Sequence, residues 1–495
     1  MRRRPSSFAS FALGVAVAIA ATSLVGQAAS SDGDRQARAQ RYEDLALFTS
    51  VLELVRNNYV DAVDEHELLM SAMRGILEGL DPHSAFMTPE AYEDMQVETK
   101  GEFQGLGIEI SKEPGTFIEV VAPIDGTPAK RAGIRARDRI TSICPTEPPE
   151  DWEEECRGTA DMSLFDAVGL MRGRKGTTIS IYVIREGMSE PQRYDIKRDT
   201  VKVASVRARM VEPGYGYVQI TSFQERTGDD VRERLAELRE ESEEPLAGLV
   251  LDLRDNPGGL LNQAVEVADQ WLREGLVVYT QGRDESERTE YRASDREIEV
   301  DYPMVVLVNE GGASASEIVA GALQDHHRAM VLGVSTFGKG SVQTVYPLEG
   351  GAGLRLTTAL YYTPSGRSIQ EVGISPDFVV RQNDAAIVGI PQRRRVRERD
   401  LQGHFTQEDA TGLESGEAPD PGEAPSETDE EGAAPDDADR AATAGPDDER
   451  PDVQLTRAVE LLKSWGYFEE LRRQREEAGP NPQAVVAKSG VEGDD

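Results

Sequence analysis

The 495-residue sequence predicts a multidomain α/β protein, because three stretches of the chain differ in their apolar pattern. Apolar residues recur at helical spacing from Tyr42 to Met95. Short apolar runs separated by glycine turns extend from Phe103 to Arg198 and indicate a small β-rich domain. From Val201 to Val380 apolar strands alternate with amphipathic helices, which is typical of parallel strands covered by helices. We therefore expect domains over residues 40–100, 103–198 and 201–380.

Residues 1–30 have the pattern of an export signal. Basic residues at positions 2–4 precede an apolar run from Phe8 to Gly26, and small residues follow it. The run is also close to the length that spans a membrane, so an uncleaved single N-terminal anchor is the alternative to a cleaved signal. Both alternatives place the rest of the chain in the periplasm or cell envelope, and the second anchors it to the inner membrane.

The chain is strongly acidic, with 90 Asp and Glu residues against 54 Lys and Arg and a net charge of −36. This charge argues against a nucleic-acid partner, because phosphate contacts need clustered basic side chains. Between Glu408 and Arg450 there are 16 acidic residues and two arginines, among many Pro, Gly and Ala residues. We expect a disordered acidic linker over residues 400–451 and a further amphipathic helix over residues 452–475.

Local patterns also predict individual elements. In the β-rich domain, a glycine loop and strand are expected over Gly105–Ile110, strands over Phe117–Val121 and Thr178–Ile184, and helices over Ala129–Ala132 and Leu164–Met171. In the α/β stretch, the expected strands are Gly216–Ile220, Leu246–Leu253, Met304–Val308 and Met330–Leu332, and the expected helices are Asp229–Arg239, Leu260–Leu272 and Ser314–His326.

The first candidate for catalysis is Ser314, which begins the string Ser-Ala-Ser-Glu at the start of an expected helix. The positive end of the helix dipole and the free backbone N–H groups there assist a serine that attacks a carbonyl. The alternative is structural, because Ser314 to Glu317 also fits the S-x-x-E capping box. His326 lies about 18 Å along the same helix, too far to act as a base for Ser314.

Two other strings are candidates for the same site. Lys339 has a glycine on each side, and a lysine buried without a carboxylate partner can act as a general base. An exposed turn lysine is the alternative. The string Leu-Asp-Leu-Arg-Asp-Asn-Pro-Gly-Gly at 251–259 follows an apolar strand, and its glycines can offer N–H groups to an oxyanion, although a plain turn has the same pattern. Neither the cysteines nor the histidines have metal-ligand spacing, so no metal or other cofactor is expected.

Together these strings resemble the carboxyl-terminal processing peptidases, or tail-specific proteases, a family of serine proteases. The resemblance covers roughly residues 42–380. It rests on Leu-Asp-Pro-His-Ser at 80–84, Gly-Leu-Gly-Ile at 105–108 with the runs at 122–123 and 128–134, the 251–259 string, Ser-Ala-Ser-Glu at 314–317 and Phe-Gly-Lys-Gly-Ser-Val-Gln at 337–343. It implies an N-terminal helical region, a PDZ domain over 103–198, and a Ser–Lys peptidase core over 201–380 that is similar to the enoyl-hydratase-like fold.

The resemblance also implies the roles of the site residues. Ser314 would be the nucleophile, and Lys339 would be the general base. Gln343 would orient the lysine amine, and Asp325, on the same helix as Ser314, is sometimes counted with the dyad. The implied donors to the oxyanion are the backbone N–H groups of Gly258, Gly259 and Ala315.

The implied substrates are polypeptides with accessible C-termini. Their tails would add as a strand to the PDZ domain, with backbone N–H groups facing the terminal carboxylate. The implied binding residues are Gly105, Leu106, Gly107 and Ile108. We also expect this domain to gate the active site, and the N- and C-terminal helices to contact an adaptor or a second copy of the chain.

Two other functions are considered. One is a non-catalytic peptide-binding scaffold on the same fold, which the intact Ser314, Lys339 and Gln343 disfavour. The other is an enoyl-hydratase-like enzyme, which the PDZ domain and the export signal disfavour. Both belong to a different functional class from a peptidase that recognises and cleaves polypeptide tails.

One segment departs from the family pattern. Cys144 and Cys156, the two cysteines of the chain, bound an acidic, proline-containing insert where the PDZ domain of the family usually has a short turn. In an oxidising compartment they could close a disulfide loop, and two free thiols are the alternative.

Overall fold

The computed structural model describes residues 38–146, 148, 152, 154–242, 244–294, 302–382, 395–407 and 452–477, in two compact units that divide after Gly79. In the first unit, residues 38–58 form a helix, which α2 (Glu65–Glu78) follows. Asp64 caps α2, because its carboxylate accepts backbone N–H groups of the first turn. The expected export segment, residues 1–30, lies outside the described residues. Among the described helices, none has both the length and the apolar content of a membrane span.

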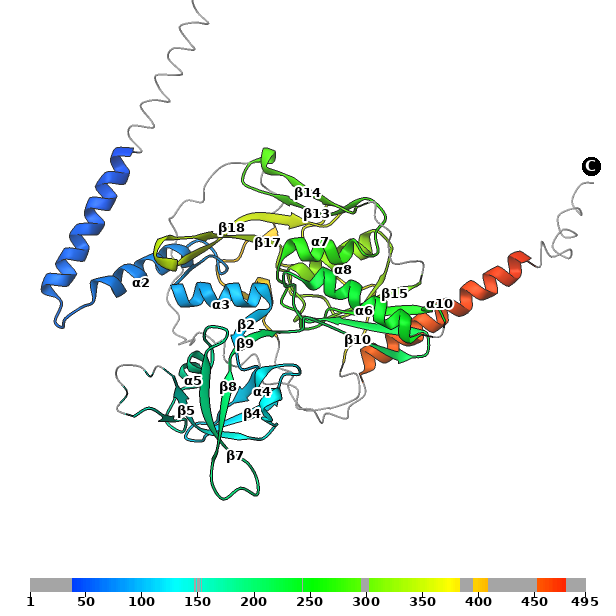
Figure 1. Cartoon of the computed structure of the whole chain (residues 1–495). Helices are drawn as coiled ribbons and strands as arrows, with labels where there is room; N and C mark the ends of the chain where they lie inside the picture. The colour runs from blue at the N-terminus through cyan, green and yellow to red at the C-terminus, as the bar shows by residue number, and fades with distance from the viewer. Residues whose placement is uncertain are drawn as a thin grey trace, which may run out of the picture. The chain divides into compact units, whose positions relative to one another are not determined.

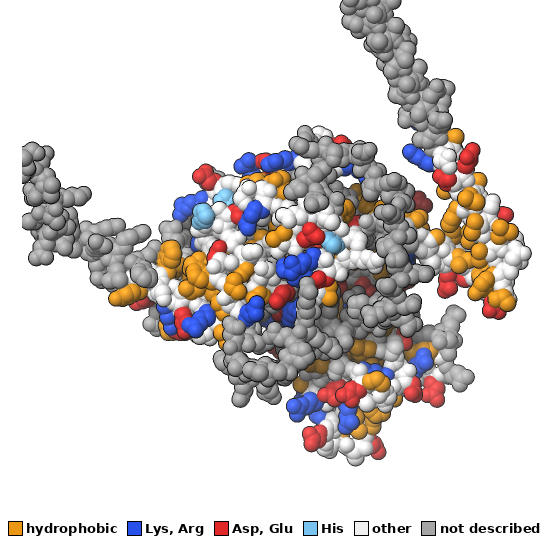
Figure 2. Space-filling view, turned by 180° about the vertical axis from the view of Figure 1, so that it is seen from behind, with side chains coloured by type: hydrophobic (Ala, Val, Ile, Leu, Met, Phe, Trp, Pro, Cys, Tyr) orange, Lys and Arg blue, Asp and Glu red, His pale blue; other side chains and the backbone are white. Residues whose placement is uncertain are grey.

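The helix of residues 38–58 exposes a series of large apolar side chains. Figure 2 shows these orange side chains along the helix, at the right of the view. They include Tyr42, Leu45, Leu47, Phe48, Val51 and Leu54. An apolar helical face of this kind commonly packs against another surface, and a partner contact through the N-terminal helices stays a prediction.

The second unit contains a β-rich domain with one antiparallel sheet of order β3-β4-β5-β7-β8, in which β6 pairs with β5. The elements are β3 (Ile108–Ser111), β4 (Ile118–Pro123), α4 (Pro128–Ala132), β5 (Arg139–Pro145), β6 (Arg157–Gly158), α5 (Leu164–Met171), β7 (Thr178–Ile184) and β8 (Gln192–Lys197). Their apolar side chains form one buried core around Ile118, Ile140 and Ile181. The bounds of β7 and α5 are those that the sequence predicts.

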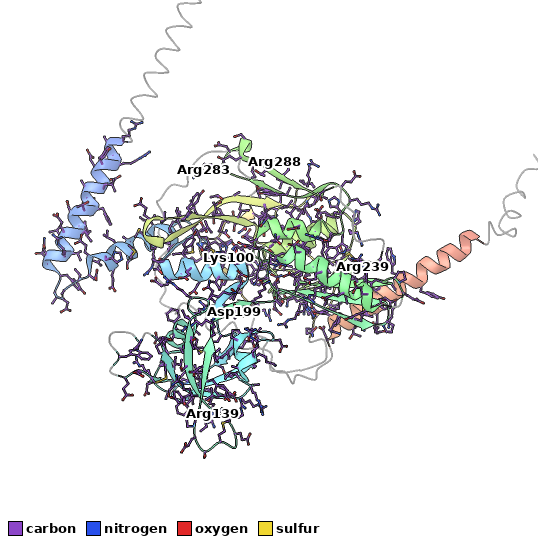
Figure 3. All side chains as sticks on the ribbon, in the orientation of Figure 1. Lys100, Arg139, Asp199, Arg239, Arg283 and Arg288 are labelled. Atoms are coloured by element: carbon purple, nitrogen blue, oxygen red, sulfur yellow. A yellow bond between two sulfur atoms is a disulfide. The ribbon has the colours of Figure 1, made fainter. Side chains whose placement is uncertain are left out.

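A two-stranded ribbon connects the β-rich domain with the α/β core. β2 (Glu102–Gly105) enters the domain and pairs antiparallel with β9 (Asp199–Lys202), which leaves it. Lys100, at the end of α3 (Pro89–Lys100), and Asp199 mark these two points of the chain (Figure 3). The entry and exit strands therefore hydrogen-bond each other.

The α/β core is built on a six-stranded sheet of order β10-β11-β12-β15-β16-β19 (Figure 1). Its strands are β10 (Val206–Glu212), β11 (Tyr215–Ile220), β12 (Gly248–Asp252), β15 (Met304–Val308), β16 (Met330–Gly333) and β19 (Phe378–Val379). The pairs from β11 to β19 are parallel, as the strand–helix alternation predicts, and β10 joins antiparallel at the edge. The connecting helices are α6 (Thr227–Glu241), α7 (Leu261–Ala268) and α8 (Ala315–Asp325).

This sheet is buried on both faces. On one face, side chains such as Leu249 and Leu251 belong to a core shared with α6, α7 and α8. On the other face, Val250 and Val305 pack with apolar residues of α10 (Val453–Glu477). Neighbouring strand residues point to opposite faces, which explains the nearly continuous apolar runs of these strands. The expected C-terminal helix therefore docks on the core, where it contacts β12, β15 and β16 (Figure 1).

The sequence patterns do not predict a second, five-stranded antiparallel sheet. Its strands are β1 (Ala85–Met87), β13 (Leu276–Gln281), β14 (Thr289–Arg292), β17 (Ser341–Pro347) and β18 (Gly353–Tyr362). β1 pairs with β18, so that Ala85 lies opposite Arg355. This long-range pairing places β1 and α3 in the second unit, and the expected helical region 40–100 is therefore divided at Gly79. Three short 3₁₀ helices complete the described elements: η1 (Glu285–Glu287), η2 (Glu349–Gly351) and η3 (Glu398–Asp400).

Residues 395–407 pack against the core. Glu398 is fully buried and bonds His83, and the carbonyl of Phe405 accepts a hydrogen bond from Gln370. The folded chain thus continues to residue 407, beyond the expected start of the linker at residue 400. Residues 408–451, the remainder of that linker, lie outside the described residues.

Candidate active site

Ser314 lies between the end of β15 and the first turn of α8. Its φ of 54° is positive, which costs a non-glycine residue about 1–3 kcal/mol and is frequent at functional sites. Ser314 and Glu317 form the capping box suggested by the sequence, and the Ser314 N–H donates to Glu317 Oε2 at 2.8 Å. Capping and a chemical role for Ser314 are therefore compatible.

The carboxylate of Glu317 is fully buried and joins the start of α8 to the turn before β17. It accepts hydrogen bonds from the N–H groups of Ser314, Gly338 and Lys339 and from the Thr336 hydroxyl. Burial raises the pKa of Glu317 to about 7, while the donors favour its charged form. The capping motif predicts only the contact with Ser314, and the other contacts arise from tertiary structure.

Lys339 lies in the glycine turn between β16 and β17 and is half-buried. Burial lowers the pKa of its amine to about 8, and the nearby Arg355 guanidinium acts in the same direction. Three carboxylates oppose this shift, those of Glu398, Glu317 and Asp81. The Lys339 N–H donates to Glu317 Oε2 at 3.0 Å, and its carbonyl accepts the Tyr361 hydroxyl. These contacts and the burial contradict the alternative of an exposed turn lysine.

The loop after β12 lies against Ser314. A Cβ on Gly258 would come within 2.7 Å of the Ser314 Cβ, so the close approach requires glycine. The N–H of Gly258 donates to Asn256 Oδ1 at 2.9 Å and is therefore not available to an oxyanion, which corrects the expectation for this glycine. In the part of the chain that the structure describes, the N–H groups of Gly259 and Ala315 have no hydrogen-bond acceptor, and both stay candidates.

Asn256 fixes this loop to its surroundings and is fully buried. Its Nδ2 donates to the carbonyl of Ile220 at 2.9 Å. Its own carbonyl accepts the N–H of Ala313 and the hydroxyl of Ser316, each at 3.0 Å. The Asn-Pro-Gly-Gly turn is thus attached directly to the residues that flank Ser314. The sequence motif marks this turn, but not these partners.

Gln343, which the resemblance implies orients the Lys339 amine, hydrogen-bonds two hydroxyl groups in the structure. Its amide donates to the hydroxyls of Ser341, at 3.0 Å, and Thr357, at 3.4 Å, on strands β17 and β18. None of the hydrogen bonds between described residues joins Gln343 to the amine of Lys339. Its role in orienting that amine therefore stays a prediction.

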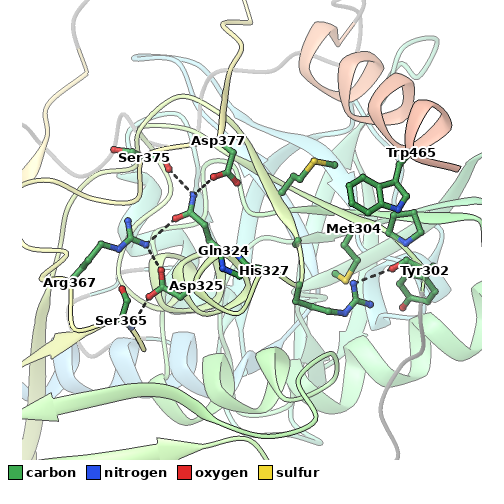
Figure 4. A pocket seen from close by; sticks show the side chains of 14 residues that line it. Tyr302, Met304, Gln324, Asp325, His327, Ser365, Arg367, Ser375, Asp377 and Trp465 are labelled. Atoms are coloured by element: carbon green, nitrogen blue, oxygen red, sulfur yellow. Dashed lines mark hydrogen bonds and ion pairs between the residues drawn. The ribbon is translucent and has the colours of Figure 1, made fainter. Parts of the chain in front are cut away.

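Asp325 lies at the opposite end of α8 from Ser314. The helix has 11 residues, so the two are separated by about 16 Å along its axis. The Asp325 carboxylate accepts the N–H of Ser365 at 2.9 Å and pairs with Arg367 at 2.7 Å. With Gln324 these residues line a separate pocket of about 920 Å³ (Figure 4). The structure therefore does not bring Asp325 next to Ser314, and its contacts with Ser365 and Arg367 lie at the end of the helix. Its inclusion in the catalytic site stays a prediction.

The expected tail-binding residues run from the last residue of β2 to the first residue of β3 in the β-rich domain. β3 is an edge strand of its sheet, so one side of it is open for a further strand. Gly107 has a φ of 76°, and a Cβ there would be 2.4 Å from Thr127, so this turn requires glycine. Among the described residues, the N–H groups of Leu106 and Gly107 have no hydrogen-bond acceptor. This arrangement suits the capture of a carboxylate.

Comparison with known proteins identifies the family. The sequence model of peptidase family S41 matches residues 214–380, and that of the activating protease CtpB N-terminal domain matches residues 11–91. The carboxy-terminal-processing protease of Bartonella bacilliformis is 40% identical over 428 residues, which cover 85% of this chain and 89% of that protein. The chain belongs to the carboxyl-terminal processing proteases. It is a serine-type peptidase.

Other carboxyl-terminal processing proteases are also similar. That of Synechocystis sp. is 38% identical over 336 residues, which cover 66% of this chain and 75% of the relative. Among solved structures, the photosystem II D1 C-terminal processing protease has 30% identity and a TM-score of 0.38, with coverage of 68% of this chain and 92% of that one. In the described part of the present protease, no group of His, Cys, Asp or Glu residues could hold a metal ion.

The Leu-Asp-Pro-His-Ser motif of the protease reaches the neighbourhood of Lys339 in two ways. Asp81 is buried and accepts the Thr357 hydroxyl at 3.0 Å, and Thr357 in turn bonds Gln343. His83 Nε2 is 2.9 Å from the Glu398 carboxylate, which accepts a hydrogen bond from the amide of Gln370. Oε1 of Gln370 in turn accepts the N–H of Gly340, the residue after Lys339, at 2.8 Å. The sequence does not predict these contacts, because the partners of Asp81 and His83 lie hundreds of positions away in the chain.

A disulfide joins Cys144 and Cys156 in the protease. It closes the acidic insert at the end of β5, and the described residues contain no free cysteine. The two cysteines that it joins are those that the sequence analysis pairs. The Arg157 guanidinium next to this bond lies 5.7 Å from the Trp152 ring centroid, so the insert also has a packing contact of its own.

Proposed function

We propose that the protease cleaves by a Ser–Lys dyad, in which Ser314 is the nucleophile and Lys339 the general base. The observation that carries this proposal is the single Glu317 oxygen that accepts the N–H groups of both residues. The lowered pKa of Lys339 supports it, because an amine with a pKa of about 8 has a useful neutral fraction near neutral pH. Arg355 and burial both favour that neutral form.

The reaction follows from these roles. The neutral amine of Lys339 takes the hydroxyl proton as the Ser314 oxygen attacks the peptide carbonyl carbon. The N–H groups of Gly259 and Ala315 stabilise the oxyanion. The protonated amine then gives its proton to the leaving nitrogen, the peptide bond breaks, and an acyl-enzyme forms. Water activated by Lys339 releases the acyl group and regenerates the serine.

The substrates in this proposal are envelope proteins with accessible C-termini. The β-rich domain acts as a PDZ domain, because β3 is an open sheet edge and the turn at Gly107 presents free N–H groups. The export pattern of residues 1–30 supports a site of action outside the cytoplasm. Binding of a tail holds the preceding chain near Ser314 for cleavage.

A fluorophosphonate probe followed by peptide mapping tests the dyad. The expected result is labelling of Ser314 in the wild-type protease and none in the Ser314→Ala or Lys339→Met variants. A scaffold without catalytic activity would bind tails but would neither react with the probe nor cleave. Labelling of another serine at the same rate in Ser314→Ala would contradict the assignment.

A further inference from the structure

The C-terminal helix α10 contacts the loop that carries one of the two candidate oxyanion donors, Gly259. Asp452, immediately before α10, pairs with Arg254: Asp452 Oδ1 lies 3.0 Å from Arg254 Nη1, and Asp452 Oδ2 lies 2.7 Å from Nη2. Gln454 Oε1 accepts the same Nη1 at 3.0 Å. Arg254 belongs to the 251–259 string, so a segment from beyond the acidic linker reaches this motif directly.

Arg254 is held between two carboxylates. Its other partner is Asp252, at the end of β12, whose oxygens lie 2.6–3.1 Å from the Nε and Nη2 atoms of Arg254. Asp252 is fully buried and also accepts the Tyr217 hydroxyl at 2.8 Å. The side chain of Arg254 is only 13% exposed. A mostly buried guanidinium that contacts two carboxylates is oriented more firmly than one that contacts a single carboxylate.

Asp452 couples this ion pair to the start of the helix. Its Oδ1 also accepts the N–H of Leu455 at 3.0 Å, as an N-terminal cap does. The apolar side chains of α10 then anchor the helix on the sheet face that α6, α7 and α8 leave uncovered. They are Leu455, Ala458, Val459 and Leu462, all buried with Val250, Val305 and Leu307. The position of Asp452 is therefore fixed by the packing of the whole helix.

The loop between β12 and α7 is short and is held at two points. Near its start Arg254 is held by Asp252 and Asp452, and two residues later Asn256 is bonded to Ala313 and Ser316, on either side of Ser314. Gly259 follows within this loop. A loss of the Asp452 contact would free the Arg254 end and broaden the range of positions of the Gly259 N–H, which stabilises charge only when it is fixed in place.

We propose that Asp452 is a positioning residue for the oxyanion loop, so that the docked C-terminal helix supports turnover by the protease. The inference rests on the proposed Ser–Lys mechanism and on its oxyanion donors. It assigns α10 a role in the reaction in addition to covering the sheet. The segment acts through Arg254 and does not touch the substrate.

The test is Asp452→Asn. Asparagine retains an acceptor for the Leu455 N–H and caps helices as well as aspartate, so the helix stays docked while the charge that faces Arg254 is lost. The expected result is a kcat about tenfold lower, with KM changed less than about twofold, because the loss falls on the transition state. Asp452→Glu should recover part of the rate. The control is Lys463→Ala. Lys463 is also on α10 but forms an exposed ion pair with Glu212 of β10, and its loss should leave kcat unchanged.

Amide hydrogen exchange provides a readout that does not depend on the identity of the nucleophile. Faster exchange in residues 253–260 of Asp452→Asn, with unchanged exchange in residues 455–462, supports the proposal. A normal kcat and normal exchange in a folded Asp452→Asn protein would overturn it. Equal acceleration in both segments would also overturn it, because it would show that the substitution only undocks the helix. An error in the proposed Ser–Lys dyad would be recognised separately, because the Ser314→Ala variant would then still cleave substrate.

Discussion

The backbone N–H groups of Ser314 and Lys339 donate to the same oxygen of the buried Glu317 carboxylate, at 2.8 and 3.0 Å. Ser314 begins α8, whereas Lys339 lies in a turn after β16, so no local interaction could bring them together. The shared acceptor fixes the two backbones relative to each other. It also links a helix cap, which the sequence motif predicts, to the general base of the proposed dyad.

Ser314→Ala is expected to abolish cleavage of a peptide with an apolar C-terminus, because no other described side chain in the site is proposed as nucleophile. Ser316→Ala is the matched control. Its hydroxyl is buried and donates to Asn256, so its loss should lower the free energy of unfolding by about 1 kcal/mol and leave most of the activity. Steady-state kinetics and thermal unfolding measure both effects. Normal turnover by Ser314→Ala would refute the dyad.

The activity of the wild-type protease should rise with pH through about 8, as Lys339 loses its proton and becomes able to accept that of Ser314. Glu317, with a pKa raised to about 7, gains a proton below that value, and this weakens its contacts with Ser314 and Lys339 on the acid side. A pH profile of kcat/KM checks the direction.

Lys339→Arg should be inactive at every pH, because a guanidinium does not lose its proton. Lys339→Met keeps a similar shape without a buried charge and should fold. If Lys339→Arg cleaved at a rate near that of the wild type, another group would have to be the base.

Glu317→Gln is expected to lower both stability and turnover. An amide offers one oxygen and an NH₂ group, so two of the N–H or O–H donors that face the carboxylate lose their acceptor in a buried site. The free energy of unfolding should fall by about 2–4 kcal/mol, and kcat should fall by more than about tenfold. Glu310→Gln, at a partly exposed position before Ser314, is the control for charge alone. Chemical denaturation and peptide cleavage would show whether the two variants differ.

Reduction of the Cys144–Cys156 bond should destabilise the β-rich domain. The cysteines are separated by 12 positions, and closing a loop near this size stabilises by roughly 3 kcal/mol in the chain-entropy model. Cys144→Ser/Cys156→Ser should lower the melting temperature by the same amount as reduction, with no additional effect of reductant. Two alkylatable thiols in the exported native protein, seen by intact-mass analysis, would show that the bond does not form there.

Amidation of a substrate C-terminus should reduce binding to the β-rich domain, because the N–H groups of Leu106 and Gly107 then face no negative charge. The Ser314→Ala protein allows binding to be measured by fluorescence anisotropy without cleavage. Ile108→Asp, at the start of the edge strand β3, should weaken binding of the free acid, whereas Ile108→Val should retain it. Equal affinity for the acid and the amide would argue against tail recognition by this loop.

The sequence by itself determined the features that depend on neighbouring residues. Apolar periodicity gave the order of strands and helices in the core, and the S-x-x-E string marked the start of α8 at Ser314. Glycine at 258 is likewise marked by its motif, because the close approach to Ser314 tolerates no Cβ. These are local effects of backbone geometry and side-chain spacing, which a single sequence displays directly.

Only the tertiary structure decided which distant groups meet. It brought Asp325 to Ser365 and Arg367, and it joined Asn256 to Ile220 and Ser316. It brought Glu398 to His83 and Asp452 to Arg254 across long stretches of chain. Such contacts follow from sheet pairing and from the burial of apolar faces, which place each polar side chain beside partners that no local pattern specifies.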